Sequence, residues 1–465
     1  MESLQCSTQE QKSNFESEHG VRYSELFRLP YYDPIRMHVI DPMHNLLLGV
    51  AKHAFMIWVD TGLLNDQKLK RIDERQLAVK VPSDIGRISG PMSKVYKCLK
   101  ADEWKHWVLI YSMYCLRNVL NKKHLNVWCM FVNACSILCK QYITIEEAES
   151  AHQLLKIYAD QFSKLYGNSS CVPNMHLMHH LRDCIQDYGS VYSFWCFSFE
   201  RFNGILGKFK TNNHSISIQI MRRFVSSTQL LQNVPECLLK FSKRESEINA
   251  FSSIYELVKI RNSTNVNPDL LQLTTEKPLS VLHQFALHSD DLFHLTSLFN
   301  KVYKNDVVKR VALMAKKAKR VSIGNEVFAT KSYRGGNTSY CNGIARWPGN
   351  NDDIILRPMI IESLFLVQVI VIKDGEEMRY FHWVAECLWL KNHEYVNFFG
   401  INCPTKLWST EFENYSEQSF IPLKYIHSRY VSCKELVDFT QPNSKLRLSD
   451  VVNIIIPIPT KSILT

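Results

Sequence analysis

The spacing of apolar residues changes once along the chain, and this change constrains the fold more than any other feature. Up to about residue 187, apolar side chains recur every three or four positions, which predicts helices. The clearest such segments are residues 46–58, 103–120, 125–141, 145–165 and 174–186. Beyond residue 320, short strand-like runs alternate with turn residues, and Asp374-Gly375 between charged flanks predicts a β-hairpin. We therefore expect an α+β protein that ends in a small, barrel-like all-β domain.

Two short extended runs interrupt the helical part, and each leads into a helix. Residues 36–40 precede Asp41, and residues 191–197, rich in β-branched and aromatic types, precede Glu200. Residues 1–24 are polar and rich in Gln, Ser and Glu, which predicts disorder. The predicted division is a disordered segment (1–24), two strand-to-helix units (25–60 and 188–235), a helical insertion (61–187), a helical region with a basic segment (236–320) and the β domain (321–460).

Composition excludes several classes of protein. Apolar residues make up 46% of the chain and charged residues 22%, which is typical of a globular protein with a sizeable core. The apolar run at 365–372 is broken by Gln368 and is too short to cross a bilayer. The first residues show no secretory signal, and the 14 cysteines form no Cys-x-x-Cys pair. We expect an intracellular protein with reduced thiols and no zinc site of paired cysteines.

Asp41 and Glu200 are the candidate metal ligands, because each stands where an extended run enters a helix. Cleavage of phosphodiesters uses carboxylates that hold two Mg²⁺ or Mn²⁺ ions about 3.5–4 Å apart. Each residue also has a simpler explanation. Asp41 before Pro42 is typical of a helix N-cap, and Glu200 in a first turn suits the helix dipole.

Histidines near these acids have alternative roles as well. His44 lies three residues beyond Asp41, so it could orient that carboxylate across one helical turn or pack in the core. His176, His179 and His180 share one helix face and could supply metal ligands. No further ligand stands near them in the sequence, so a structural role is favoured.

The excess of basic residues permits a polyanionic partner. The chain has 55 Lys and Arg residues against 45 Asp and Glu, a net charge of +10. Lys208 and Lys210 follow Glu200, and Arg222 and Arg223 add to this positive charge. The other candidates for nucleic-acid contact lie between residues 301 and 320: Lys309, Arg310, Lys316, Lys317, Lys319 and Arg320. A solvated helix face is the alternative for that segment.

Two motifs together resemble those of the CACTA (En/Spm-type) DDE transposases. The first is Asp41-Pro42-Met43-His44-Asn45-Leu46, and the second is Phe199-Glu200-Arg201-Phe202-Asn203-Gly204. The pair is fairly specific in its order, and weaker similarity extends with gaps from about residue 21 to 433. The resemblance implies an RNase H-like core with a large all-α insertion. In such a core Asp41 is the second catalytic Asp, Glu200 is the third acid and His44 is an accessory group.

The resemblance also implies metal-dependent DNA cleavage and strand transfer, with Mg²⁺ or Mn²⁺ held by Asp41 and Glu200. The first catalytic Asp of the family lies well upstream of this block, whereas only 40 residues precede Asp41 here. We therefore expect a truncated core that retains two of three carboxylates and has no strand-transfer activity alone.

Three functions follow from these patterns. The first is an incomplete, transposon-derived transposase-like protein of the nucleus, with DNA as its partner. The second is a non-catalytic module that binds DNA or a protein, including a second copy of itself, without membrane association. A metal-independent hydrolase ranks last, because no nucleophile elbow or Cys/His signature is present.

Overall fold

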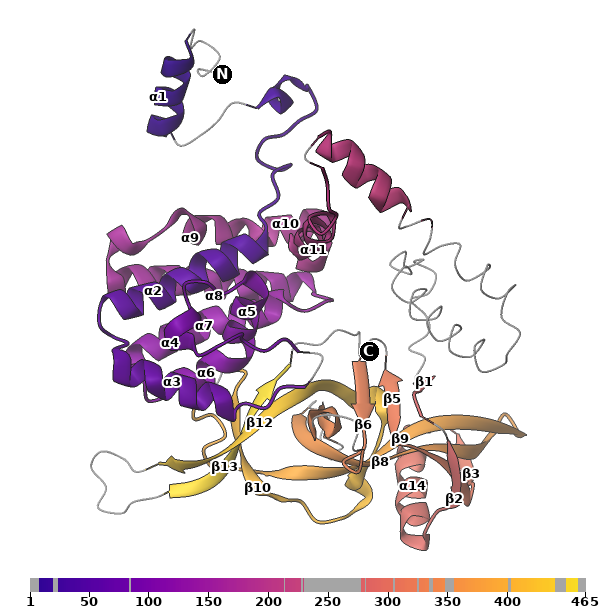
Figure 1. Ribbon diagram of the computed structural model, residues 1–465. Helices are drawn as coiled ribbons and strands as arrows, with labels where there is room; N and C mark the ends of the chain where they lie inside the picture. Colours follow the sequence, from indigo (N-terminus) through magenta and orange to yellow (C-terminus); the bar gives the residue numbers. More distant parts are fainter. Residues whose placement is uncertain are drawn as a thin grey trace.

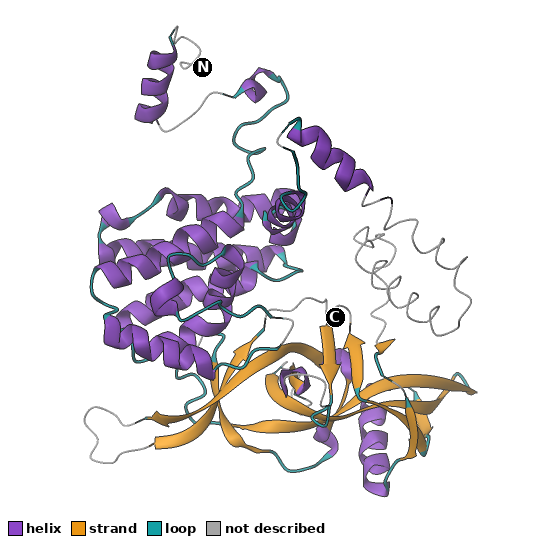
Figure 2. Cartoon of the chain, viewed as in Figure 1, coloured by secondary structure: helices purple, strands orange, loops and turns teal. Residues whose placement is uncertain are grey.

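A helical region is followed by an antiparallel β-barrel with additional strands in the computed structural model (Figures 1 and 2). The predicted α+β class, with a barrel-like C-terminal part, is confirmed. The structure describes residues 8–19, 24–82, 85–212, 214–226, 229, 277–280, 282–303, 306–323, 326–333, 338–347, 355–399, 403–439 and 449–458.

The helical region follows the predicted apolar periodicity closely. Its larger helices are η3 (Met43–Ala51, a π-helix), α2 (Lys52–Asp60), α3 (Asp66–Ala78), α7 (Lys122–Leu138), α8 (Ile145–Tyr166), α10 (Leu181–Tyr188) and α11 (Phe197–Leu206). Shorter turns of helix are η2 (Glu25–Arg28), α4 (Met92–Val95), α5 (Ala101–His106), η4 (Trp107–Tyr111), α6 (Ser112–Leu116), η5 (Asn168–Ser170), α9 (Pro173–Leu177), η6 (Met178–His180) and η7 (Val191–Ser193). Residues 216–226 are also helical.

Helices α7 and α8 lie at the centre of this region and pack along each other. Thr144 begins α8 with a capping box: its hydroxyl accepts the Glu147 N–H, and the Glu147 carboxylate accepts the Thr144 N–H. Trp58 of α2 meets Trp128 of α7 edge to face, with ring centroids 5.1 Å apart. Aromatic packing therefore joins the first helices of the region to its centre.

Six strands close the barrel, each antiparallel to both neighbours, in the order β7, β8, β9, β10, β13, β12. Closure matters because it leaves no free edge among these strands. Their bounds are β7 (Asn342–Arg346), β8 (Leu356–Lys373), β9 (Glu376–Asn392), β10 (Lys406–Phe412), β12 (Ile426–Asp438) and β13 (Ser449–Pro457).

The predicted hairpin at Asp374-Gly375 is confirmed as the turn between β8 and β9. Lys373 pairs with Glu376, so the loop has two residues. Both have positive φ, 51° at Asp374 and 85° at Gly375, as a type I′ turn requires. The hairpin extends from this turn to the pairing of Met359 with Trp389, and both strands contribute to the barrel wall and to the strands outside it.

Additional strands extend the barrel wall. β11 (Phe420–Pro422) pairs with β9, β3 (Val307–Val311) and β4 (Met314–Ala318) pair with β8, and β2 (His283–Ala286) pairs with β4. Helix α14 (Ser289–Val302) covers this extension through Leu295, Leu298 and Phe299. A separate small sheet contains β1 (Lys277–Pro278), β5 (Arg320–Ile323) and β6 (Glu326–Ala329), and the turns η9 (Thr338–Cys341), η10 (Glu417–Ser419) and η11 (Leu423–Tyr425) complete the β region.

One hydrophobic core is shared by the helical region and the barrel. Val431 of β12 and Ile454 of β13 belong to the same buried cluster as Trp128 of α7. Beside it, Glu435 of β12 bridges to Arg117, at 2.6 Å, and to Arg75, at 3.4 Å. The barrel is therefore packed directly onto the helices (Figure 1).

The two predicted strands next to the acidic residues are wrong. Residues 36–40 have no regular structure, and 191–197 comprise η7 and the start of α11; no strand lies in the described parts of 25–60 and 188–229. A strand needs a partner for its backbone groups, and here side chains make the contacts instead. Arg36 pairs with Asp187, and the Tyr192 hydroxyl donates to the Cys139 carbonyl at 3.0 Å.

The predictions for both flanks also need correction. Within the segment predicted to be disordered, Gln9–His19 form helix α1, which is rich in the helix formers Gln, Glu and Lys. Within 236–320, residues 236–276 lie outside the described part, and α14 is helical as predicted. The basic segment, however, forms β3, β4 and β5, because Val311, Ala315 and Ala318 are buried against the long β8–β9 hairpin. The β region thus begins before residue 321.

Among the described residues, no helix combines the length and the apolar character needed to cross a membrane.

Candidate functional site

Asp41 joins the two predicted corners. Its Oδ1 accepts the N–H of Met43 at 3.1 Å and the N–H of Cys196 at 2.8 Å. Its Oδ2 accepts the N–H of His44 at 3.0 Å and lies 2.5 Å from the His44 Nδ1. The bonds to Met43 and His44 cap the start of η3, as the N-cap interpretation expects. The bond to Cys196 adds a direct connection to the residue that precedes α11.

Glu200 lies one helical turn beyond Cys196. Its N–H donates to the Cys196 carbonyl at 2.9 Å, so it stands in the first turn of α11. Burial raises the pKa of the Cys196 thiol, and the negative charge of Asp41, a hydrogen bond to Asp41 and the charge of Glu200 raise it further. The negative charges of both predicted acids therefore raise the pKa of one thiol, that of Cys196. Asp41 belongs to the first motif and Glu200 to the second.

Other residues of the first motif hold η3 against α9. The Asn45 side chain donates to the Asn174 carbonyl at 2.9 Å. Gly49 lies so close to Asn174 that a Cβ on Gly49 would stand 2.3 Å from its Nδ2 atom. The spacing of Asp41, Asn45 and Gly49 thus has a packing explanation: all three residues lie at the contacts of η3 with later helices.

The side chains of Asp41, His44 and Cys196 form one cluster of possible metal ligands, each offering one donor atom within 4.8 Å of the others. It is the only such group of three or more among the described residues, and Glu200 is outside it. The Asp41 side chain is 14% exposed and that of His44 is 54% exposed. The cluster combines one carboxylate, one imidazole and one thiol at the surface.

These residues do not fit the Mg²⁺ or Mn²⁺ pair that the resemblance implies. A pair of such ions needs several oxygen ligands that clamp both metals, whereas the cluster offers a single carboxylate beside an imidazole and a thiol. Among the described residues around Asp41 and Glu200, no β-sheet supports the two acids.

The three histidines of the predicted helix face are not assembled as a metal site. His176 and His180 contact each other through Nε2 atoms 3.4 Å apart, and His179 packs edge to face with His152. Burial lowers the pKa of His179, and His152, His176 and His180 lower it further. These rings contribute to the packing between α8 and the α9–α10 segment.

Helix α11 presents apolar side chains to solvent. None of its residues is buried, and Phe199 is 64%, Phe202 53% and Ile205 41% exposed. The neighbouring helical segment 216–226 exposes Ile216, Ile218 and Met221. These two helical segments therefore leave these six large apolar side chains exposed. We use the name α11 apolar face for these six residues, three on α11 and three on the helical segment 216–226.

The predicted nucleic-acid contacts fall into two separate groups. Lys208 and Lys210 are exposed just beyond α11, whereas the others lie on β3, on β4, directly after β4 and at the start of β5, in a distant part of the molecule (Figure 1). β3 and β4 follow one another along the same edge of β8. Lys309 pairs there with Glu377, and Arg320 lies over the Tyr333 ring. Four more basic residues are exposed here, and we call them the basic strand segment: Arg310, Lys316, Lys317 and Lys319.

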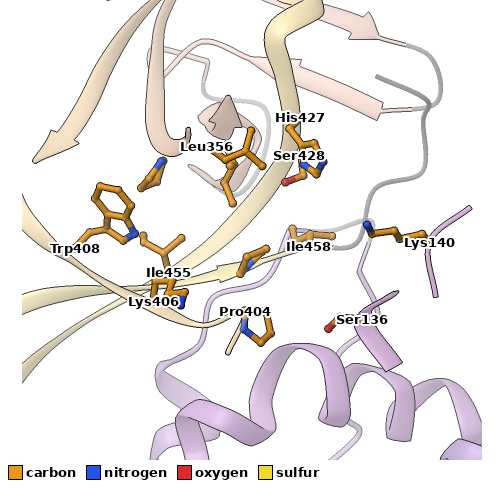
Figure 3. A pocket seen from close by; sticks show the side chains of 13 residues that line it. Ser136, Lys140, Leu356, Pro404, Lys406, Trp408, His427, Ser428, Ile455 and Ile458 are labelled. Carbon is orange, nitrogen blue, oxygen red and sulfur yellow. The ribbon is translucent and has the colours of Figure 1, made fainter. Parts of the chain in front are cut away.

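A cavity of about 340 Å³ lies inside the open end of the barrel, beside α7 (Figure 3). Trp408, Ile344 and Ile455 supply apolar lining, and Lys140, two residues beyond α7, lies on the side opposite Trp408. Lys406 and His427 add polar atoms to the same space. Sequence reasoning missed this cavity because five strands and one helix contribute to it, and no local motif marks their meeting.

Charged groups around the cavity are held in place by neighbours. The Lys140 Nζ donates to a Glu147 carboxylate oxygen at 2.6 Å, and the Lys406 Nζ donates to the Asn397 side chain at 2.7 Å. Burial lowers the pKa of His427, and the positive charge of Lys140 lowers it further. The cavity thus combines apolar walls with two amines and a histidine that favours its neutral form.

No family model, no curated protein and no solved structure matches this chain.

Proposed function

We propose that the chain is a transposase-derived protein with an incomplete nuclease core that binds DNA without cutting it by itself. The observation that carries the ancestry is the hydrogen bond from the Cys196 N–H to Asp41. It holds the start of the Glu200 helix against the first motif, although 155 residues separate the bonded pair. Two acids that belong to one site need a contact of this kind between the chain segments that carry them.

Two features support the loss of cleavage. Glu200 is outside the Asp41 cluster, and that cluster offers a single carboxylate beside an imidazole and a thiol. Two-metal catalysis needs carboxylates that clamp both ions. The α11 apolar face further suggests that a covering element is absent from the described residues, as in a core that is incomplete.

The basic strand segment supports DNA binding. Lys316 and Lys317 are exposed on the paired strand β4 and Lys319 directly follows this strand, so the sheet fixes their backbone. Lys317 also lies over the Phe285 ring, 5.9 Å from its centroid. Fixed cations that release counterions from phosphates give an affinity that falls steeply with salt.

Titration of a short DNA duplex at several salt concentrations tests the binding. Neutralising the three lysines to Gln should reduce the slope of log affinity against log salt by about 2–3, since each phosphate contact contributes about 0.9. The matched control neutralises the exposed Lys123, Lys156 and Lys164 of α7 and α8, which removes the same net charge. An equal reduction of the slope in both variants would mean that DNA binding depends on net charge and not on a defined site.

A cleavage assay with Mg²⁺ and with Mn²⁺ tests the second half of the proposal. The full chain should leave duplex DNA intact under conditions in which it is bound. Cleavage that disappears in Asp41→Ala and in Glu200→Gln would show that the acidic corner is catalytic, and the proposal of an inactive core would then fail.

The barrel cavity supports a second candidate function, the binding of a small amphipathic anion. Apolar walls with a few polar groups are typical of ligand sites at the mouths of barrels. Lys140 and Lys406 provide the charge that an anionic end group needs. Dodecanoate should bind with saturation, and more weakly in Leu356→Trp, which places bulk at the rim of the cavity. Leu436→Trp on β12, also exposed but outside the cavity, is the control. Equal binding by both variants would refute this function.

A further inference from the structure

We propose that Asp41, His44 and Cys196 form a binding site for a borderline transition-metal ion of the Zn²⁺ class, not for Mg²⁺. The three donor atoms lie within 4.8 Å of one another and come from two segments that are far apart in the sequence. Imidazole, thiolate and carboxylate are the ligands that Zn²⁺ and Co²⁺ take in proteins, usually three of them with an open fourth position in reactive sites. The proposal does not depend on DNA binding.

The backbone holds the ligands before any ion arrives. Asp41 stands two residues before η3 begins, His44 is in the first turn of η3, and Cys196 is the residue before α11. The Cys196 N–H bond to Asp41 fixes the two helix starts relative to each other. Only the exposed His44 ring and the Cys196 side chain need to adjust, which keeps the cost of organising the site low.

An ion can enter by replacing protons that now point at Asp41. The His44 Nδ1 contacts Oδ2 at 2.5 Å, and the Cys196 thiol also interacts with this carboxylate. On binding, the metal forms bonds to the imidazole nitrogen, the sulfur and Oδ2. The thiol proton leaves to solvent, and the imidazole either changes tautomer or releases a proton. The three backbone N–H bonds to Asp41 remain in place. Binding should therefore release protons and strengthen as the pH rises.

Titration of the full, reduced chain with Co²⁺ tests the site. A thiolate ligand gives a charge-transfer band in the near ultraviolet, which we expect to saturate at one Co²⁺ per chain. Zn²⁺ should displace the Co²⁺, whereas millimolar Mg²⁺ should not. Absence of a saturable band, or its removal by Mg²⁺, would overturn the proposal.

Matched variants identify the ligands. Cys196→Ser should abolish the charge-transfer band, and the exposed Cys171→Ser should leave it unchanged. His44→Gln should weaken Co²⁺ binding by about a hundredfold or more while circular dichroism shows an intact fold. Glu200→Gln should change affinity by less than about tenfold, because Glu200 is outside the cluster. A band that survives in Cys196→Ser, or that is lost in Cys171→Ser, would place the metal elsewhere.

Discussion

The Asp41 carboxylate accepts the backbone N–H of Cys196 at 2.8 Å, and this bond connects the start of η3 to the start of α11. The same carboxylate caps η3 through Met43 and His44. One side chain therefore supports two helix starts, whatever chemistry the corner performs.

Asp41→Ala should lower the free energy of unfolding by about 2–3 kcal/mol, because it removes an N-cap and leaves the Cys196 N–H without its charged acceptor. Urea denaturation followed by circular dichroism measures the loss. Asp41→Asn keeps an oxygen acceptor and should cost less than half as much. Equal stability of wild type and Asp41→Ala would mean that solvent replaces these bonds without cost.

Glu435→Gln should destabilise the contact between the barrel and the helices by about 3 kcal/mol. Glu435 faces two buried guanidinium groups, those of Arg75 and Arg117, and both would lose their carboxylate partner. The control is Glu411→Gln, which removes an exposed pair with Lys391 and should change stability by less than about 1 kcal/mol. Similar thermal unfolding of the two variants would contradict a special role for Glu435.

Gly375→Ala should cost about 1 kcal/mol, measured by thermal unfolding. Gly375 has a φ of 85°, and the space around it is open, so the cost comes from the backbone alone. Asp374→Asn should be neutral within about 0.5 kcal/mol, since Asn also tolerates the left-handed conformation of this turn. A neutral Gly375→Ala would indicate that the turn can change its type.

Stability should decrease as the pH falls below 6.5. Burial is the main cause that lowers the pKa of His124, His179, His382 and His427 from the ordinary value of 6.5. The unfolded chain then binds protons more readily than the folded chain. The stability from the neutral rings is complete above pH 6.5 and is lost as the pH drops toward the lowered folded values.

Urea denaturation at pH 7.5, 6.5 and 5.5 measures this decrease. His382 is enclosed by Tyr303 and Phe299, and Lys424 adds positive charge beside it. His382→Gln should make the pH dependence shallower, whereas the exposed His283→Gln should leave it unchanged. A pH dependence that His382→Gln leaves unaltered would assign the effect to the other histidines.

Most helices could be predicted because their apolar periodicity is a local property. The Asp374-Gly375 hairpin was equally accessible, since turn chemistry depends on two residues. The runs before Asp41 and Glu200 misled prediction because β-branched and aromatic residues also occur where rings pack onto helices. Trp195 illustrates this: its ring packs against Tyr192 and lies under the Lys105 amine. The basic segment was misassigned because its apolar positions are few and face a partner strand distant in sequence.

The acidic corner was only half accessible from the sequence. Motifs identified Asp41 and Glu200, and the spacing of His44 indicated its contact with Asp41. Cys196 was missed because a single cysteine without a nearby second ligand carries no signal in one sequence. The cavity was missed for a related reason, since only the closure of the barrel brings its walls together.

The core shared by the helices and the barrel has a consequence for limited proteolysis. The chain between residues 229 and 277 connects the two parts of this core, yet Trp128, Val431 and Ile454 stay in contact with one cluster through packing alone. A single cut in that connection should therefore yield two fragments that co-elute as one particle and separate only in denaturant. If the two fragments are expressed separately, each should expose its share of the hydrophobic core. Each should then be insoluble until the other fragment is added.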